Sequence, residues 1–350
     1  MPVVKIGDFL IGPDHPPFIV AEAGINHNGD LEKAIEMVRV AKRAGADAVK
    51  FQTFKADEFV GDPDQTYTYL SQGKEVTESM LEMFRRYEFP RDVWFALRSE
   101  CDKEGIIFLS TPQNHTDLDL LLEVGIPAIK VGSDDLTNFP LLASYAETGL
   151  PLILSCGMSD LSEVYQALYT VGAFSGYPTI LLLCTSQYPT PPEDVNLAKL
   201  RTLQAAFPMV VTGFSDHTRG PLASSLAAVL GACFFEKHFT LDHDFPGPDH
   251  WFSENPEELE AWVQSVRDAY RMLGSPVVSP TKLELEMRQI ARRSVVALQD
   301  IKDGDIVTIE SVGLRRPGEG IPPTQLPSII GRRTRHFIPK GSRIDWVDLS

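Results

Sequence analysis

Two histidines of this chain follow a serine and a glutamate by two residues, each pair at the end of an apolar run: Ser215 with His217, and Glu236 with His238. Alternate side chains of a strand share one face, so the members of each pair point the same way. If those faces point inward, the two imidazoles meet beside Glu22. They would then form an open site for Mn²⁺ or Mg²⁺ that can take a carbonyl oxygen. The alternative is that each histidine only caps its strand through hydrogen bonds.

Two lysines, Lys50 and Lys130, end other apolar runs, where a buried ammonium is costly unless an anion accompanies it. Small hydroxyl residues end further runs: Thr111, Ser133, Ser155, Ser186 and Ser215. Ammonium and hydroxyl groups together suit a phosphate and a carboxylate, and no glycine-rich nucleotide loop accompanies them. Two alternatives remain open. The lysines could instead neutralise carboxylates such as Glu22, or one could form a Schiff base, as in some barrel aldolases.

Eight apolar runs, each followed by a stretch with helical spacing, would bring these residues together. Nearly continuous apolar runs are typical of parallel strands buried on both faces. The expected strands are Phe18–Glu22, Ala46–Gln52, Ile106–Ser110, Ala128–Val131, Leu152–Ser155, Ile180–Cys184, Val210–Ser215 and Cys233–His238. This eightfold repeat predicts an α/β fold, a (β/α)8 TIM barrel whose active site lies at the carboxyl ends of its strands.

Two additions to the barrel are expected from the same pattern. A strand pair at Val3–Ile6 and Phe9–Ile11 would cover the bottom of the barrel. The connection between the second and third strands, residues 55–104, is much longer than a normal crossover and contains a tyrosine-rich piece. We expect two helices in it, Thr77–Tyr87 and Pro90–Glu104. We interpret the insertion as a loop that shapes substrate specificity.

A change in composition near residue 288 indicates a second domain. Residues 288–350 contain 11 Lys plus Arg and 7 Asp plus Glu, whereas the whole chain has a net charge of −16. We therefore divide the chain into a catalytic barrel at 1–274, a linker at 275–290 and a small β-rich domain at 291–350, able to dock on a barrel mouth. Short strands are expected in this domain at Ser294–Ala297, Ile306–Thr308, Gly313–Arg315 and Thr334–Phe337.

The overall acidity of this chain of 350 residues argues against a nucleic-acid or anionic-membrane partner. The four cysteines have no metal-site or disulfide-ladder spacing, which is typical of reduced thiols in a cytoplasmic protein. The N-terminal residues lack the features of a signal peptide, and no apolar run approaches the length of a membrane span. A cytoplasmic location is therefore expected.

Several segments give the chain a family resemblance. They are AEAGINHNG at 21–29, VKFQ at 49–52, KVGS at 130–133, SCGM at 155–158, CTSQYP at 184–189, FSDHT at 214–218 and EKHFT at 236–240. The order and content of these motifs resemble the sialic acid (N-acetylneuraminate) synthase family. The tail, with RRPG at 315–318 and IPKG at 338–341, resembles its C-terminal antifreeze-like (SAF) domain.

The resemblance implies a reaction. Phosphoenolpyruvate would condense with an open-chain N-acyl hexosamine, typically N-acetylmannosamine, to give a nine-carbon 2-keto-3-deoxy sugar acid and phosphate by C–O cleavage. Carried over position by position, the family pattern implies Glu22, Lys50 and Tyr188 as catalytic residues and His217 and His238 as ligands of the divalent metal.

The same pattern implies two sets of substrate contacts. Phosphoenolpyruvate would be held by Lys50, Thr111, Lys130, Ser133, Ser155, Ser186 and Ser215. The sugar would be contacted by Gln52, Asp135, Tyr188 and Asp249, and its N-acyl group by Arg316, contributed by the other subunit of a domain-swapped homodimer.

Departures from the pattern bear on the sugar. Ser186 and Asp135 stand where some bacterial members carry Asn and Glu, so a diacetamido-trideoxyhexose, leading to a legionaminic- or pseudaminic-type acid, is an alternative substrate. Two alternatives belong to other classes. One is the metal-independent Schiff-base aldolase, and the other is a carbohydrate- or ice-binding protein whose function would reside in the tail, at about residues 285–350.

Overall fold

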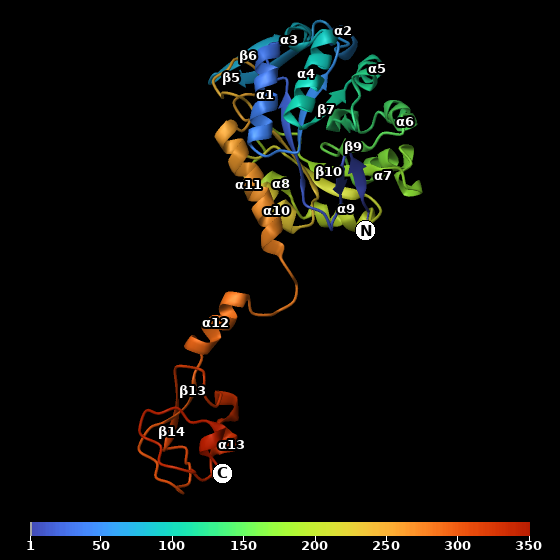
Figure 1. Cartoon of the computed structure of the whole chain (residues 1–350). Helices are drawn as coiled ribbons and strands as arrows, with labels where there is room; N and C mark the ends of the chain where they lie inside the picture. Colours follow the sequence, from blue (N-terminus) through green and yellow to red (C-terminus); the bar gives the residue numbers. More distant parts are fainter. Residues whose placement is uncertain (1) are drawn as a thin grey trace. The chain divides into compact units, whose positions relative to one another are not determined.

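The computed structural model of the protein describes residues 2–350. The chain divides into two compact units, the first ending at Gly274 and the second comprising Ser275–Ser350; Figure 1 draws both. Each unit has a hydrophobic core of its own.

The first unit is an eight-stranded parallel barrel, as the sequence predicted. The barrel strands are β3 (Phe18–Gly24), β4 (Ala48–Thr53), β7 (Ile107–Pro112), β8 (Ile129–Val131), β9 (Leu152–Ser155), β10 (Thr179–Cys184), β11 (Val211–Asp216) and β12 (Phe234–His238). They are hydrogen-bonded in the order β7–β4–β3–β12–β11–β10–β9–β8. The two end strands, β7 and β8, lie against each other, so the sheet is nearly closed.

Helices surround this barrel. They are α1 (Leu31–Arg43), α4 (Arg91–Glu104), α5 (His115–Val124), α6 (Phe139–Glu147), α7 (Leu161–Thr170), α8 (Pro192–Val195), α9 (Lys199–Ala206), α10 (Leu222–Val229) and α11 (Pro256–Leu273), with short 3₁₀ turns at Ser133–Asp135 and Ala173–Ser175. Figure 1 shows α1 between α4 and α11 on the outside of the sheet. Within residues 2–350, no helix combines the length and the apolar character that crossing a membrane requires.

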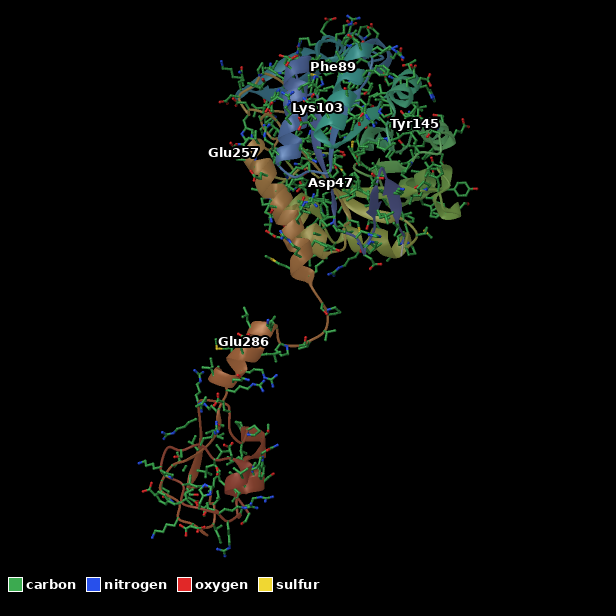
Figure 2. The ribbon with its side chains drawn as sticks, in the orientation of Figure 1. Asp47, Phe89, Lys103, Tyr145, Glu257 and Glu286 are labelled. Atoms are coloured by element: carbon green, nitrogen blue, oxygen red, sulfur yellow. The ribbon has the colours of Figure 1, made fainter. Side chains whose placement is uncertain are left out.

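The helices are fastened to the barrel by packing and by a few ion pairs. Tyr145 and Phe89, both labelled in Figure 2, are buried in the core between helices and strands. Asp47, labelled in the same figure, precedes β4 and forms an ion pair with Arg267 of α11 at 3.0 Å. Arg267 also donates hydrogen bonds to the carbonyls of Pro17 and Gly45, so this pair anchors α11 beside the amino-terminal ends of β3 and β4.

A hairpin closes the bottom of the barrel, as expected. It consists of β1 (Val4–Ile6) and β2 (Phe9–Ile11) in antiparallel register. Its buried residues Val4, Ile6 and Ile11 join one apolar cluster with inward-facing residues of the barrel strands. This cluster forms an apolar floor on which the polar site rests.

The long insertion differs from the sequence prediction in its first half. Residues 66–79 form a second hairpin, β5 (Thr66–Ser71) and β6 (Lys74–Ser79), and the expected helix at 77–87 begins only at α3 (Met80–Tyr87). A short helix, α2 (Ala56–Phe59), precedes them. Cross-strand partners explain the change: Tyr69 donates to Glu78 at 2.6 Å, and the hydroxyls of Thr68 and Thr77 are 2.8 Å apart. β-branched residues favour such pairing, and Ser79 then caps α3.

The second unit is small and has little regular structure. It contains α12 (Lys282–Ala291), which Thr281 caps, then β13 (Ser294–Ala297), β14 (Val312–Arg315), α13 (Leu326–Ile329) and 3₁₀ turns at Pro323–Gln325 and Trp346–Asp348. The two strands pair antiparallel, as expected at these positions. The prediction of strands at 306–308 and 334–337 is wrong. Ile306 and Thr334 form only isolated β-bridges, and turns make up most of the chain around them.

Candidate active site

The interior of the barrel changes from apolar to polar within one two-residue step along the strands. Val20 of β3 and Ala48 of β4 belong to the apolar floor, and Glu22 and Lys50 are the next inward-facing residues of these strands. The same step leads from floor residues to the inward-facing Thr111, Lys130, Ser155, Cys184 and Glu236, and on β11 two such steps lead from Val211 past Gly213 to Ser215. Strand register therefore gathers residues from all eight strands into one polar layer.

Two lysines and two glutamates form the centre of this layer. Lys50 Nζ lies 2.5 Å from Glu22 Oε2 and 3.7 Å from Glu236 Oε2. Lys130 Nζ lies 3.6 Å from Glu236 Oε1 and donates to Ser155 Oγ at 2.8 Å. All four charged side chains are at least nine-tenths buried, so their charges balance one another in a weakly screening environment.

Burial and the neighbouring charges separate the pKa values of the two carboxyl groups. Burial, together with the charge of Glu236, raises the pKa of Glu22 to about 7 although Lys50 opposes the shift. The pKa of Glu236 is lowered, because Lys130, Lys50 and a hydrogen bond from Ser215 outweigh its burial. The pKa of Lys50 is raised, because the two carboxylates outweigh burial. Glu22 can therefore exchange a proton near neutral pH while Glu236 stays ionised and Lys50 stays protonated.

Hydroxyl groups complete the layer. Lys50 Nζ donates to Thr111 Oγ1 at 3.2 Å, and Ser215 Oγ donates to Glu236 Oε1 at 3.0 Å. Ser133 accepts a hydrogen bond from Gly157 N at 3.0 Å. A Cβ atom on Gly157 would collide with the hydroxyls of both Ser133 and Ser186, so a glycine here lets the two serines approach.

The two histidines lie side by side above the lysine–glutamate cluster, with ring centroids 5.5 Å apart. His217 Nδ1 donates to the Thr185 carbonyl at 2.8 Å, which leaves Nε2 as the atom able to bind a ligand. His238 Nδ1 is buried without a hydrogen-bond partner, and burial together with the neighbouring positive charges lowers the pKa of this imidazole. The nearby Cys184 thiol and the Thr185 carbonyl outweigh burial and raise the pKa of His217, so a ligand at Nε2 competes with a proton.

This donor set fits a divalent ion with two imidazole ligands. Among residues 2–350, no three His, Cys, Asp or Glu side chains are grouped to hold an ion, so the remaining positions would belong to water or substrate. The unpartnered His238 Nδ1 is the observation in favour of a missing ligand, because buried polar atoms are nearly always bonded.

Aromatic rings form one wall beside the histidines. Tyr188 packs against His217 with ring centroids 4.2 Å apart and against Phe252 at 5.0 Å, and Phe252 lies 5.5 Å from His238. Burial of the phenol against these rings raises the pKa of Tyr188, and the nearby Cys184 and Asp249 add to the shift. The hydroxyl therefore stays protonated and can donate a hydrogen bond. Burial raises the pKa of Asp249 to about 6 against the opposing effect of His217.

Within residues 2–350, three residues expected in the site form no hydrogen bond or ion pair with the lysine–glutamate cluster. Gln52 is half-buried on β4, opposite Thr111 in the register and on the same face as Lys50. Asp135 accepts a hydrogen bond from Asn138 at 3.0 Å, and burial raises its pKa. Arg316 belongs to the second unit. Their contacts with a sugar remain predictions.

Three residues have a larger place in the site than the sequence indicated. Glu236 links both lysines and Ser215, and its signal was the shared face with His238. Cys184 Sγ lies 3.8 Å from His217 Nδ1, although the sequence indicated only a reduced thiol at this position. Asp134 is among the charged neighbours that raise the pKa of Tyr188, whereas the family pattern pointed to the adjacent Asp135.

A groove of about 740 Å³ opens beside the polar layer. It runs between the ends of β9 and β10 and the helices α7 and α9, and Cys184 and Ser186 line it together with Lys199. The groove therefore shares a wall with the site without being centred on the lysine–glutamate cluster.

Comparisons with known proteins match both units of the chain. Residues 37–278 match the NeuB family, and residues 292–350 match the SAF domain. The N,N'-diacetyllegionaminic acid synthase of Legionella pneumophila is 42% identical over 333 residues, which cover 94% of this chain and 93% of that protein. The human N-acetylneuraminate-9-phosphate synthase is 36% identical over 329 residues, 92% of this chain and 90% of that protein.

A solved structure has the same architecture. The N-acetylneuraminic acid (sialic acid) synthetase of Leptospira borgpetersenii superposes with a TM-score of 0.73 at 33% sequence identity, covering 81% of this chain and 94% of that one.

Proposed function

The chain belongs to the NeuB family of sugar-acid synthases, and from this premise we propose that it condenses phosphoenolpyruvate with an open-chain N-acyl hexosamine, releasing phosphate. The product is a 2-keto-3-deoxy sugar acid with nine carbons. The observation that carries the proposal is the buried cluster of Lys50, Lys130, Glu22 and Glu236, beneath two histidines that lie side by side.

The polar layer suits the two anionic groups of phosphoenolpyruvate. Lys50 and Lys130 supply two ammonium groups, and Thr111, Ser155 and Ser215 supply hydroxyls within bonding distance of this charge cluster. Protonation of Glu22 removes one of the two negative charges, which would let an anion replace it beside Lys50. The phosphate is proposed to lie toward Ser133 and Ser186, on either side of Gly157.

The proposed reaction forms one carbon–carbon bond and breaks the C–O bond to phosphate. The methylene carbon of phosphoenolpyruvate bonds to the aldehyde carbon of the sugar, and the aldehyde oxygen takes a proton. Water adds to the carbon that carries the phosphate. The C–O bond to phosphate then breaks while the new hydroxyl gives its proton to the departing phosphate and becomes the keto oxygen. Glu22, with a pKa of about 7, is proposed to be protonated when phosphoenolpyruvate binds, to give that proton to the aldehyde oxygen, and then to take one from the attacking water. A divalent ion, Mn²⁺ or Mg²⁺, held by His217 and His238 would polarise the aldehyde oxygen.

The charge state of the lysines disfavours the aldolase alternative. A Schiff base needs an unprotonated amine, whereas the pKa of Lys50 is raised and its ammonium contacts two carboxylates. Lys130 is likewise paired with Glu236 and donates to Ser155. Both lysines are therefore proposed to act as charged groups.

Two sugar substrates are candidates. N-acetylmannosamine follows from the family resemblance, and a diacetamido-trideoxyhexose is supported by the 42% identity to the Legionella pneumophila synthase. We propose that Gln52, Asp135, Tyr188 and Asp249 contact the sugar and that Arg316 does so from the second subunit of a domain-swapped homodimer. Arg316→Ala should then raise the KM of the sugar more than that of phosphoenolpyruvate.

Phosphate release from phosphoenolpyruvate tests the proposal. The assay is run with Mn²⁺ or with a chelator across both classes of sugar, and release that needs a metal and one particular sugar is expected. His217→Ala should lower the metal-dependent rate at least about 100-fold. His243→Ala, in a half-exposed histidine paired with Glu258 at 3.1 Å, is the matched control and should keep the rate.

Two results would contradict the proposal. Turnover that persists in chelator, with pyruvate trapped on the protein by borohydride, would favour the aldolase. Absence of phosphate release with every sugar, together with no binding of phosphoenolpyruvate in a titration, would remove the synthase assignment.

A further inference from the structure

A second buried charge cluster lies on the opposite side of the barrel wall from the site. The alternation that points Glu236 and His238 inward points Lys237 outward, and it does the same for Asp216 between Ser215 and His217. Lys237 is 2% exposed. Its Nζ lies 3.2 Å from Asp216 Oδ2 and 3.4 Å from Glu254 Oε1.

Lys237 and Asp216 together hold the residue that follows His217. Lys237 Nζ donates to the carbonyl of Thr218 at 2.6 Å, while the backbone N–H and the hydroxyl of Thr218 both donate to Asp216 Oδ1 at 2.8 Å. Asp216 Oδ2 also accepts from Ser224 at the start of α10, so the end of β11 is tied to the helix that follows it. Every polar group of Thr218 is thus used to fix the loop that carries His217.

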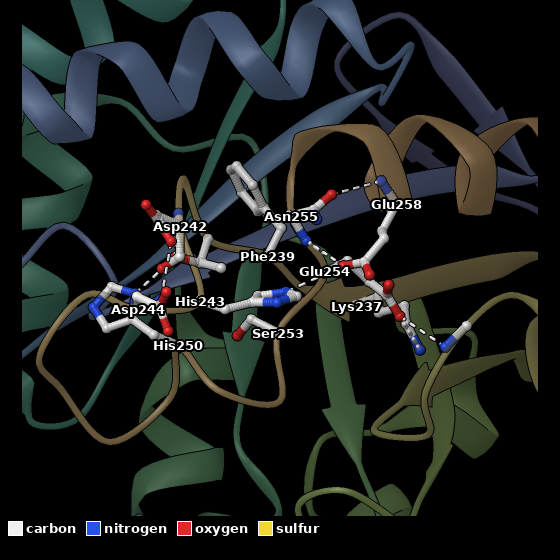
Figure 3. A network of polar contacts seen from close by, with 12 residues as sticks. Lys237, Phe239, Asp242, His243, Asp244, His250, Ser253, Glu254, Asn255 and Glu258 are labelled. Atoms are coloured by element: carbon white, nitrogen blue, oxygen red, sulfur yellow. Dashed lines mark hydrogen bonds and ion pairs between the residues drawn. The ribbon is translucent and has the colours of Figure 1, made fainter. Parts of the chain in front are cut away.

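Glu254 extends the cluster to His238. Its carboxylate accepts from Gly220 N at 2.9 Å, and its backbone N–H donates to the His238 carbonyl at 2.9 Å. The Glu254 carbonyl accepts from Thr240 N at 2.9 Å. The backbone of Glu254 is therefore hydrogen-bonded to the residues on both sides of Phe239, at the end of β12. Figure 3 shows Lys237 and Glu254 meeting beside Asn255, where α11 begins.

We propose that Lys237 is a positioning residue for the histidine pair, an inference that rests on the proposed function for the role of that pair. The Lys237 ammonium donates to the carbonyl of Thr218, the residue after His217. It is also paired with Glu254, whose backbone N–H donates to the carbonyl of His238. A buried ion cluster adds little stability compared with apolar residues of equal volume, so its value here lies in the geometry it imposes. The three charges fix the carboxyl ends of β11 and β12 relative to each other, and they do so more specifically than apolar packing alone would.

Two variants test the inference, with one control. Lys237→Met keeps the length of the apolar part of the side chain and removes the ammonium, and Glu254→Gln removes one carboxylate with little change of shape. Arg267→Met is the control, because it breaks a different and only partly buried ion pair, with Asp47, beside the amino-terminal ends of the strands. Circular dichroism and thermal melts first confirm that each variant is folded at the temperature used.

Two readouts distinguish positioning from a general loss of stability. The first is the affinity for Mn²⁺ alone, from the electron paramagnetic resonance signal of the free ion. Lys237→Met should weaken it at least tenfold and Glu254→Gln should weaken it less, while Arg267→Met leaves it unchanged. The second is the ring signals of His217 and His238 in protein labelled with ¹³C-histidine, which should shift in both test variants and not in the control.

Each outcome decides a separate point. Folded Lys237→Met and Glu254→Gln proteins with wild-type Mn²⁺ affinity and unshifted histidine signals would overturn the inference. If the wild-type protein itself does not bind Mn²⁺, the metal in the proposed function is refuted, and the histidine signals alone then decide whether Lys237 positions the pair.

Discussion

Glu236→Gln perturbs the electrostatic balance of the polar layer with little change of shape. In the wild-type protein its two carboxylate oxygens lie 3.7 Å from Lys50 Nζ and 3.6 Å from Lys130 Nζ. The amide oxygen of glutamine can still accept from Ser215, as the carboxylate does at 3.0 Å. The variant therefore removes one of two negative charges that face two buried ammonium groups.

The size of the effect follows from burial. Lys50 retains Glu22, but Lys130 is left with the neutral acceptors Ser155 and the Val131 carbonyl. Breaking a buried ion pair by removing one partner costs about 3–5 kcal/mol. Because the amide oxygen stays as an acceptor, we expect the lower end, about 3 kcal/mol. For a unit of this size that corresponds to a fall in melting temperature of about 6–12 °C.

Urea unfolding followed by tryptophan fluorescence measures the loss, since Trp94, Trp251 and Trp262 all lie in the first unit. Inorganic phosphate should restore much of it, because an anion can occupy the position of the missing charge. At a concentration of 100 times its dissociation constant, a ligand stabilises the folded state by about 2.7 kcal/mol. Phosphate should therefore stabilise Glu236→Gln more than wild type.

Glu123→Gln is the control, because this exposed carboxylate pairs with Arg91 at the surface, where ion pairs contribute little. Its unfolding midpoint should match that of wild type. A Glu236→Gln protein as stable as this control, or equal stabilisation of wild type and Glu236→Gln by phosphate, would refute this electrostatic role of Glu236.

Two further predictions concern stability. Burial, assisted by His250, lowers the pKa of His27 to about 3, below the value of 6.5 in an unfolded chain. Its contribution is therefore fully present above pH 6.5 and is lost as the pH falls toward 3, at up to about 1.4 kcal/mol per pH unit. His27→Asn, which keeps an acceptor for Gly29 N, should flatten this slope in urea unfolding between pH 5 and 7, and an unchanged slope would show that His27 does not cause it. Ile6→Ala, in the buried floor hairpin, should cost about 2–5 kcal/mol without altering phosphate release per folded molecule; a changed rate would show that floor and site are coupled.

Most of the barrel was predictable because its evidence is local. The apolar run of a strand and the alternation of its side chains can both be read from neighbouring residues. Seven of the expected strands needed only shifts at their ends, and Leu152–Ser155 was correct at both ends. The insertion was not predictable in the same way. Thr77 fits a helix or a strand, and the choice depended on Thr68 and Tyr69 across the hairpin.

The candidate site was likewise predictable where its features are local and unpredictable where they depend on residues distant in the chain. The alternation of strand residues is enough to place Glu236 and His238 on one face, because a period of two is a property of the extended backbone. It could not reveal that Glu236 meets Lys50 and Lys130, which lie more than one hundred residues away in the chain. The raised pKa of Glu22 and the lowered pKa of Glu236 depend on these meetings, so two similar side chains acquire different protonation only in the folded barrel.

The sequence by itself determined which strand residues share a face, since backbone periodicity assigns each residue to a face, and the polarity of these residues separates the polar layer from the apolar floor. Tertiary structure alone decided which charges neighbour one another and that Lys237, invisible as a functional residue in the sequence, joins the loops of His217 and His238. The physical reason is that electrostatic energy depends on distance and burial between residues remote in the chain, and only the closed barrel sets both.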